Sequence, residues 1–217
     1  MTQPILYSFR RCPYAMRARM AIAVSGQVCR LREVVLRDKP SEMLAASPKG
    51  TVPVVVTPGG DVIEESLDVI TWALSHNDPQ DWLSPEQGSA EEMHALIDEC
   101  DGSFKHALDR YKYSGRYDGV GTAEQRDLGA RFLATLDNRL SRNPHLFGTR
   151  ICLADIAIFP FIRQFANTDR KWFDAQRLPH LQAWLAAHLD SALFTSIMTK
   201  YPQWKTGDTE PYFPVAA

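Results

Sequence analysis

Cys12 is the residue whose type and position could do chemistry. It follows an apolar run at residues 5–9 that predicts a strand, and it directly precedes Pro13, a residue favoured at the first position of a helix. A thiol at a helix start faces unpaired backbone N–H groups and the positive end of the helix dipole, and both favour the thiolate. The sequence therefore predicts a nucleophilic sulfur at this position.

Three arginines lie close to this cysteine in the chain and favour the anion further: Arg10, Arg11 and Arg17. Position 15, where a dithiol motif carries its second cysteine, is an alanine. A Cys12 thiolate would therefore work as a single nucleophile and need an external thiol to complete its cycle. The other cysteines are expected to be small buried apolar residues: Cys29, Cys100 and Cys152.

The composition restricts the classes of partner. Among 217 residues, Lys and Arg number 24 and Asp and Glu number 26, so the net charge of −2 argues against a dedicated nucleic-acid binder. No apolar run reaches the length of a membrane helix, and residues 5–9 are too short a run for a secretion signal. The cysteines and histidines show no metal-ligand spacing. We therefore expect a cytoplasmic protein without a metal, which binds neither nucleic acid nor membrane.

Residues 1–76 alternate strand-like and helix-like segments that would position the thiol. Strands are predicted at 5–9, 31–36, 52–56 and 62–64, and helices at 13–25, at 41–46 and from Ser66 onward. This order predicts an α/β domain with a mixed four-stranded sheet and helices on both faces.

The polar, turn-rich stretch 77–89 is predicted to be a linker. From residue 90 the strand pattern disappears, and helical periodicity continues at 90–113, 122–143, 153–165 and 179–189. Residues 90–217 are therefore predicted to form an all-helical domain. Two aromatic stretches, at 172–173 and 212–214, could be docked in the core or could cover a cleft.

Three motifs in register resemble the N-terminal domain of cytosolic glutathione transferases, and within that superfamily the cysteine-type, omega-like class. They are residues 7–15 (YSFRRCPYA), 48–54 (PKGTVPV) and 64–66 (EES). Residues 148–156 resemble the buried helix start of the second domain in this family, with Cys152 where the family has a capping Ser or Thr. The resemblance implies a thioredoxin-like N-terminal domain followed by an all-α C-terminal domain, and a homodimer.

The same resemblance implies a glutathione site beside Cys12. Val52 would pair through its backbone with the cysteinyl part of glutathione, as an added strand does, next to a cis proline at Pro53. Tyr14 belongs to the same set of glutathione-binding residues. Pro53 could also have a structural role alone, but it should lie beside the cysteine in either case.

Three further residues would bind the charged ends of glutathione. Ser66, as the N-cap of its helix, would bind the γ-glutamyl carboxylate, and Glu65 would face the ammonium group. Lys39 would pair with the glycyl carboxylate as a flexible point charge. The alternatives are a plain helix cap for Ser66 and solvated surface charges for Glu65 and Lys39.

The second substrate would lie in an acceptor pocket whose candidate residues are Phe9, Arg10, Arg110, Tyr111 and Tyr113. A Tyr/Arg stripe is equally consistent with packing between domains. Tyrosine-type transferases use a tyrosine on the first strand to stabilise the glutathione thiolate, and Tyr7 stands on that strand. Because Cys12 would be nearer the sulfur of glutathione, Tyr7 is expected to pack in the sheet or line the pocket.

The leading hypothesis is a glutathione-dependent thiol transferase or reductase, of the dehydroascorbate reductase type, that forms a mixed disulfide between Cys12 and its co-substrate glutathione. Its second substrate would be a small-molecule or protein disulfide. One alternative is conjugation of glutathione to electrophiles. The other is a regulatory or ligand-binding module on the same fold, which is less favoured because the nucleophile and the Glu-Ser pair are both present.

Overall fold

The chain divides into two compact units in the computed structural model, which describes residues 3–119 and 121–215. Residues up to Pro79 together with those from Ser191 onward form an α/β unit, and Gln80–Asp190 form a helical unit. The sequence-based division assigned residues 191–217 to the helical domain instead. The difference arises because the C-terminal residues add a helix and a strand to the α/β unit.

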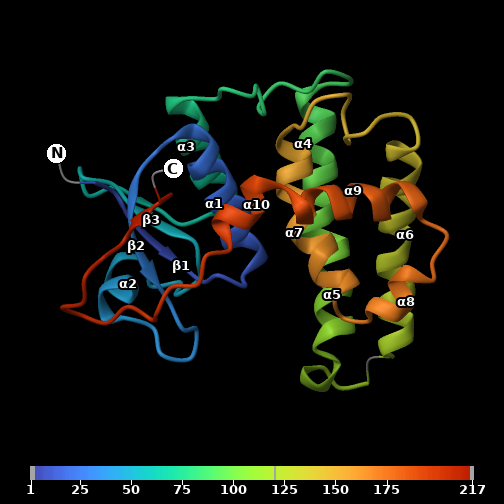
Figure 1. Ribbon diagram of the computed structural model, residues 1–217. Coiled ribbons are helices and arrows are strands. Elements are labelled where there is room, and N and C mark those ends of the chain that lie inside the picture. Colours follow the sequence, from blue (N-terminus) through green and yellow to red (C-terminus); the bar gives the residue numbers. More distant parts are fainter. Residues whose placement is uncertain (1–2, 120, 216–217) are drawn as a thin grey trace. The chain divides into compact units, whose positions relative to one another are not determined.

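A five-stranded sheet forms the centre of the α/β unit, in the order β4-β3-β1-β2-β5 (Figure 1). The strands are β1 (Ile5–Ser8), β2 (Cys29–Glu33), β3 (Val54–Val56), β4 (Val62–Ile63) and β5 (Tyr212–Phe213). β1 and β2 are parallel, and the other pairs are antiparallel, so the predicted mixed sheet is confirmed. The predicted number of four strands is wrong, because β5 pairs with β2 from the far end of the chain.

The second strand begins two residues earlier than the predicted segment 31–36. Its parallel pairing with β1 sets the boundaries, with Ile5 opposite Arg30 and Ser8 opposite Glu33. Cys29, Leu31 and Glu33 are buried in alternation along the strand. The apolar pattern did not indicate this start, because residues 29 and 30 belong to the strand through their pairing with β1 and β5.

The helices of the α/β unit are α1 (Pro13–Ser25), α2 (Ser41–Ala46), α3 (Ser66–His76) and α10 (Ala192–Ile197). α1 packs against α3 and α10, while α2 lies apart from α1 and α3 (Figure 1). Gly26 ends α1 with a φ of 72°, which glycine adopts without steric cost. Met43 of α2 joins a buried cluster with Tyr7 and Val54, which lie on facing positions of the sheet.

The helical unit contains α4 (Ala90–Glu99), η1 (Cys100–Phe104), α5 (Lys105–Lys112), η2 (Ser114–Arg116), α6 (Thr122–Leu140), α7 (Leu153–Ala166), α8 (Arg170–Asp174) and α9 (Pro179–Asp190). A π-helical turn at η1 divides the segment 90–113 that was predicted as one helix. α7 is buried along nearly its whole length. In the described part of the chain, each helix is too short or too polar to span a lipid bilayer.

Residues 77–89 contain neither helix nor strand, but they are not simply an exposed connection. The Trp82 side chain is fully buried. The backbone carbonyl oxygen of Trp82 accepts a hydrogen bond from Leu153 N at 2.8 Å. Phe173 and Phe213 are also buried, so one ring of each aromatic stretch is docked in a core.

Candidate functional site

Cys12 occupies the turn between β1 and α1. Its N–H donates to Phe9 O at 3.0 Å, and its carbonyl oxygen accepts the first helical hydrogen bond, from Met16 N at 2.9 Å. Cys12 is the N-cap residue of α1, with extended backbone (φ −76°, ψ 124°), and Pro13 is the first helical residue. The predicted strand–Cys-Pro–helix arrangement is therefore present, and the thiol is half-buried rather than enclosed.

The loop before β3 brings Val52 and Pro53 to Cys12. The Cys12 thiol donates to Val52 O at 3.7 Å, and it packs against a buried cluster that includes Val52 and Tyr7. The Val52–Pro53 peptide bond is cis. Cys12 and Val52, which are forty positions apart in the sequence, thus meet at the sulfur atom.

A buried pair of opposite charges, Arg19 and Glu33, holds the turn that carries Cys12. Glu33 Oε1 accepts from Arg10 N at 2.7 Å, and Arg19 Nη2 donates to Arg10 O at 2.7 Å. Arg19 Nη1 also donates to Ser8 Oγ at 3.1 Å. Both polar backbone atoms of Arg10 are therefore clamped by side chains that are almost fully buried.

The clamp places a buried cation near the thiol. Burial lowers the pKa of Arg19 to about 10, while the negative charges of Glu33 and Cys12 act in the opposite direction. Burial also raises the pKa of Glu33, against the hydrogen bond from Arg10 N and the charge of Arg19. Neither residue can be recognised from the sequence, because a buried charged side chain inside a helix or strand has no local signature.

The arginines that were expected to flank Cys12 take different positions. The Arg11 side chain is exposed, with its guanidinium 5.4 Å from the centre of the Phe9 ring. Arg17 is buried and lies over the Tyr14 ring at 5.0 Å. Phe9 and Tyr14, both predicted site residues, are thus half-buried, and each ring has an arginine guanidinium lying over it.

The start of α3 holds the predicted Glu-Ser pair. Ser66 is the first helical residue and Glu65 is the N-cap, so the predicted N-cap is wrong by one residue. Ser66 is buried, and its Oγ accepts from Arg17 Nε at 3.0 Å instead of capping the helix. The Glu65 carboxylate is exposed and forms an ion pair with Lys49. Arg17 and Lys49 therefore bring cations to this helix start, a feature that the sequence reasoning missed.

Lys39 lies in the loop between β2 and α2, with an exposed side chain. A Cβ added to Gly50 would lie 3.3 Å from Lys39 Nζ, so the ammonium group approaches the segment that precedes Val52. The C-terminal segment holds this loop, since Gln203 Nε2 donates to Asp38 Oδ2 at 2.9 Å. The predicted glutathione residues of the first 76 positions therefore all belong to the α/β unit.

Tyr7 is buried in the sheet. Its hydroxyl group is hydrogen-bonded to Arg32 Nη1, and its ring meets Trp204 edge-on at a centroid distance of 6.4 Å. Burial raises the pKa of the Tyr7 hydroxyl, and the Arg32 charge only partly offsets this effect. These contacts favour the expected packing role for Tyr7.

The other acceptor candidates belong to the helical unit and contact its own aromatic rings. Tyr111 is buried with its ring 5.1 Å from that of Phe165, and burial raises the pKa of its hydroxyl. Arg110 lies over the Tyr117 ring at 4.7 Å, and Arg116 lies over the Tyr113 ring at 4.4 Å. Their part in an acceptor pocket stays a prediction.

One group of possible metal ligands occurs in the described residues, where atoms of His145, Asp155 and His188 lie within 4.8 Å of one another. Their linear spacing carried no such signal. Both Asp155 oxygens already accept hydrogen bonds of 2.9–3.0 Å, from the N–H groups of Leu146, Cys152 and the Trp184 ring. We therefore interpret this group as the hydrogen-bond network that holds the start of α7.

Comparison with known families covers both units. The model of the glutathione S-transferase N-terminal domain matches residues 6–82, and that of the glutathione S-transferase C-terminal domain matches residues 95–187. A probable glutathione transferase from Aplysia californica is 47% identical over 58 residues, which make up 27% of this chain and 63% of that protein.

Solved structures share the fold. A glutathione transferase family member from Pseudomonas fluorescens Pf-5, with two glutathione molecules bound, has a TM-score of 0.75 at 20% identity, over 90% of this chain and 92% of that chain. A glutathione S-transferase from Methylobacillus flagellatus KT with glutathione bound has a TM-score of 0.75 at 22% identity, over 90% and 98%. With both domain families matched and the fold shared, the chain belongs to the glutathione transferase superfamily.

Proposed function

We propose that the protein is a cysteine-type, omega-like glutathione transferase that uses Cys12 for thiol transfer with glutathione as co-substrate. The observation that carries this proposal is the difference among the four cysteines. Cys12 is half-buried at a helix start, whereas the other three, which are Cys29, Cys100 and Cys152, are buried. Burial raises the pKa of Cys29 and of Cys152 to about 12, so neither provides a thiolate near neutral pH.

The reaction would consist of two disulfide exchanges. The Cys12 thiolate attacks the glutathione sulfur of a mixed disulfide, forms a Cys12–glutathione disulfide and releases the substrate as a thiolate, which takes up a proton. A second glutathione thiolate then attacks the glutathione sulfur bound to Cys12. Oxidised glutathione leaves, and the Cys12 thiolate is restored. One glutathione thiol is therefore consumed for each substrate thiol released, and its proton balances the one taken up by the substrate thiolate.

The glutathione site would use the predicted residues as follows. The backbone of Val52, beside Pro53, would pair with the cysteinyl part, and its position next to the Cys12 thiol supports this role. The cations at the start of α3 suit the γ-glutamyl carboxylate, with Ser66 as a hydrogen-bond donor and Glu65 facing the ammonium group. Lys39 would pair with the glycyl carboxylate, and Tyr14 would line the site.

The substrate would be a small-molecule or protein disulfide, and the acceptor pocket would include Phe9, Arg10, Arg110, Tyr111 and Tyr113. We also propose that the protein acts as a homodimer in the cytoplasm, where glutathione is kept reduced. The Arg19–Glu33 clamp would act on the reaction indirectly, by fixing the turn that carries the sulfur.

Mass spectrometry after incubation with oxidised glutathione tests this proposal. We expect a single adduct of the mass of glutathione, mapped to Cys12 by peptide fragmentation and reversed by reduced glutathione. An adduct on one of the buried cysteines with Cys12 free would contradict the mechanism. Binding of glutathione without an adduct, together with conjugation of an aryl halide, would favour the conjugating alternative.

A further inference from the structure

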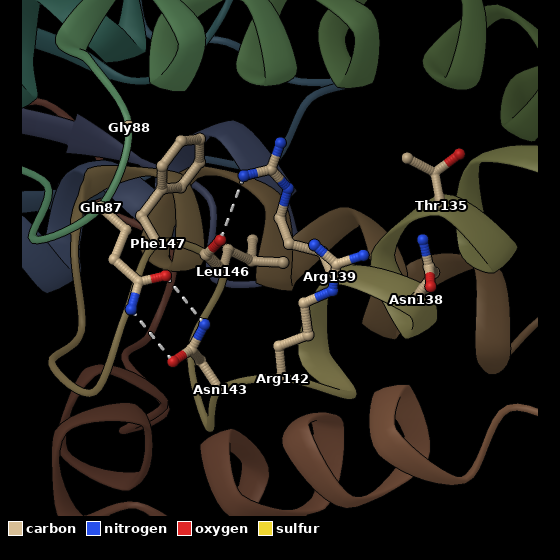
Figure 2. A pocket seen from close by; sticks show the side chains of 9 residues that line it. All are labelled: Gln87, Gly88, Thr135, Asn138, Arg139, Arg142, Asn143, Leu146 and Phe147. Carbon is tan, nitrogen blue, oxygen red and sulfur yellow. Dashed lines mark hydrogen bonds between the residues drawn. The ribbon is translucent and has the colours of Figure 1, made fainter.

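A polar cavity of about 340 Å³ lies in the helical unit, between the end of α6, the loop that follows it and residues 87–88 (Figure 2). None of the predicted site residues lines it. Its charged side chains are Arg139 and Arg142, and its uncharged polar side chains include Gln87, Asn138 and Asn143. The lining contains no carboxylate.

The two arginines carry positive charges that no acidic side chain of the described residues holds in an ion pair, although the Glu92 carboxylate lies beside Gly88 of the lining. Within residues 3–119 and 121–215, neither Arg139 nor Arg142 forms an ion pair. Asp137, the acidic neighbour on α6, has Oδ1 occupied by the N–H groups of His180 and Leu181, both at 2.9 Å. The negative end of the α6 dipole, about half a charge, offsets only part of the two positive charges.

The Arg139 guanidinium is held in place before any ligand arrives. It lies over the Phe147 ring at 4.5 Å, and its Nη1 donates to Leu146 O at 3.4 Å (Figure 2). Phe147 and Leu146 are themselves buried, so this support is rigid. Because a guanidinium has five N–H donors, Arg139 keeps further donors available for a ligand in the cavity.

The wall beside Phe147 is fixed by a reciprocal amide pair. Gln87 Nε2 donates to Asn143 Oδ1 at 3.2 Å, and Asn143 Nδ2 donates to Gln87 Oε1 at 3.0 Å. Figure 2 shows both arginine side chains between this pair and the side chains of Thr135 and Asn138. Gln87 N also donates to Phe147 O at 3.0 Å, which joins the wall to the support of Arg139.

We propose that this cavity binds a phosphate monoester that has a small, hydroxyl-bearing organic body. Two guanidinium groups match a phosphoryl group of nearly two negative charges better than they match a single carboxylate. The volume exceeds what the ion alone would fill, and the side-chain amides and the Thr135 hydroxyl suit a polar body. The site belongs to one unit and is independent of the chemistry at Cys12.

Calorimetric titration of the full chain with glycerol phosphate tests the site, with inorganic phosphate and glycerol as comparison ligands. We expect saturable binding of glycerol phosphate, weaker binding of inorganic phosphate and none of glycerol. Arg139→Met and Arg142→Met should each weaken binding at least tenfold, because each removes charge-assisted hydrogen bonds. Glutathione adduct formation at Cys12 should be unchanged in both variants.

Arg131→Met is the matched control, because it removes the same charge from an exposed position of α6 outside the cavity. It should leave the affinity for glycerol phosphate within about twofold. The proposal is overturned if no saturable binding occurs in the millimolar range, or if Arg131→Met weakens binding as much as the cavity variants do. Equal affinities for inorganic phosphate and glycerol phosphate would show that the cavity binds the phosphate group alone, which would overturn the proposal that the ligand has an organic body.

Discussion

Cys12 and Cys152 stand at the same kind of position in two different units. Each is the N-cap residue of a helix, α1 for Cys12 and α7 for Cys152, and each has extended backbone. Their surroundings differ in burial and in the sign of the nearby charge. Cys12 is half-buried and has the buried cation Arg19 as a charged neighbour, whereas Cys152 is buried beside the carboxylate of Asp155.

The consequence for Cys152 is a thiol that stays protonated. Burial raises its pKa to about 12, and the Asp155 charge acts in the same direction, against hydrogen bonds from the backbone of α7. The thiol donates to Asp155 Oδ2 at 3.4 Å. A helix N-terminus therefore does not by itself make a reactive cysteine, since desolvation and the nearest charge outweigh it.

Replacement of the Cys12 sulfur should have the largest effect, and replacement of the Cys152 sulfur should have little effect on activity. Cys12→Ala should lower thiol-transfer activity roughly a thousandfold or more, because the nucleophile is lost. Cys152→Ala should leave that activity within about twofold, although it removes the same atom from a helix N-cap. Steady-state rates with a glutathione mixed disulfide measure both variants. Equal losses would show that the two N-caps do not differ in function.

Acid should destabilise the network that surrounds Cys152. Burial lowers the pKa of His188 to about 4, against the charge of Asp155, while the unfolded chain has the ordinary value near 6.5. The unfolded chain therefore binds the proton first. The contribution of the neutral His188 to the stability of the fold is complete above pH 6.5 and is lost as the pH falls towards 4. The free energy of unfolding should fall by about 3 kcal/mol over this range.

Denaturant unfolding at pH 7 and pH 4.5 measures this loss. In His188→Leu the drop in unfolding free energy between the two pH values should shrink, whereas the exposed His106→Leu should retain it. Asp155 adds a loss at still lower pH, because its pKa is held below the ordinary value by hydrogen bonds despite burial. The same drop in His188→Leu as in the natural chain would contradict the assignment.

Arg19→Lys should sharpen the contrast at Cys12. Lysine keeps the charge but loses the fork that joins Ser8 Oγ to Arg10 O. We expect kcat for thiol transfer to fall about tenfold with KM for glutathione little changed, because the turn that positions the sulfur loosens. Arg11→Lys, next to Cys12 but exposed, is the control and should have no such effect. A loss confined to KM would instead place Arg19 in binding.

Cys152→Ser should have the smallest effect. A hydroxyl oxygen accepts the backbone N–H groups of the first helical turn better than sulfur does, so the unfolding free energy should rise by up to about 1 kcal/mol. Chemical denaturation at pH 7 measures this change. A large loss of stability would mean that the packing of the sulfur outweighs the cap.

Local patterns sufficed for much of the fold. The apolar run, Cys12 and Pro13 predict the strand, the N-cap and the start of α1, because each depends on neighbours within one helical turn. The end of that helix at Gly26 follows from the same short-range logic. The order of the strand and helix segments predicted the mixed sheet, helical periodicity predicted the helical second unit, and the family resemblance implied the closeness of Val52 to Cys12.

Pairings between distant segments decided what the sequence could not. β5 joins the sheet from residues 212–213, and its partner β2 begins two residues earlier than its apolar pattern indicated. Ser66 Oγ accepts a hydrogen bond from Arg17, which is 49 positions away in the sequence, and Glu65 is the N-cap residue of α3. Each of these features depends on a segment that is distant in the sequence but close in the fold.

The amino-acid sequence by itself determined that Cys12 would precede a helix and that the chain would form an α/β unit and a helical unit. The sequence also predicted that Cys152, unlike Cys12, would be a buried cysteine, but only the tertiary structure decided the surroundings that make the two thiols differ. Burial and the Arg19–Glu33 and His145–Asp155–His188 groups come from residues far apart in the chain. The energy of a charged sulfur depends on these through-space neighbours, whereas the start of α1 follows from the adjacent residues Cys12 and Pro13.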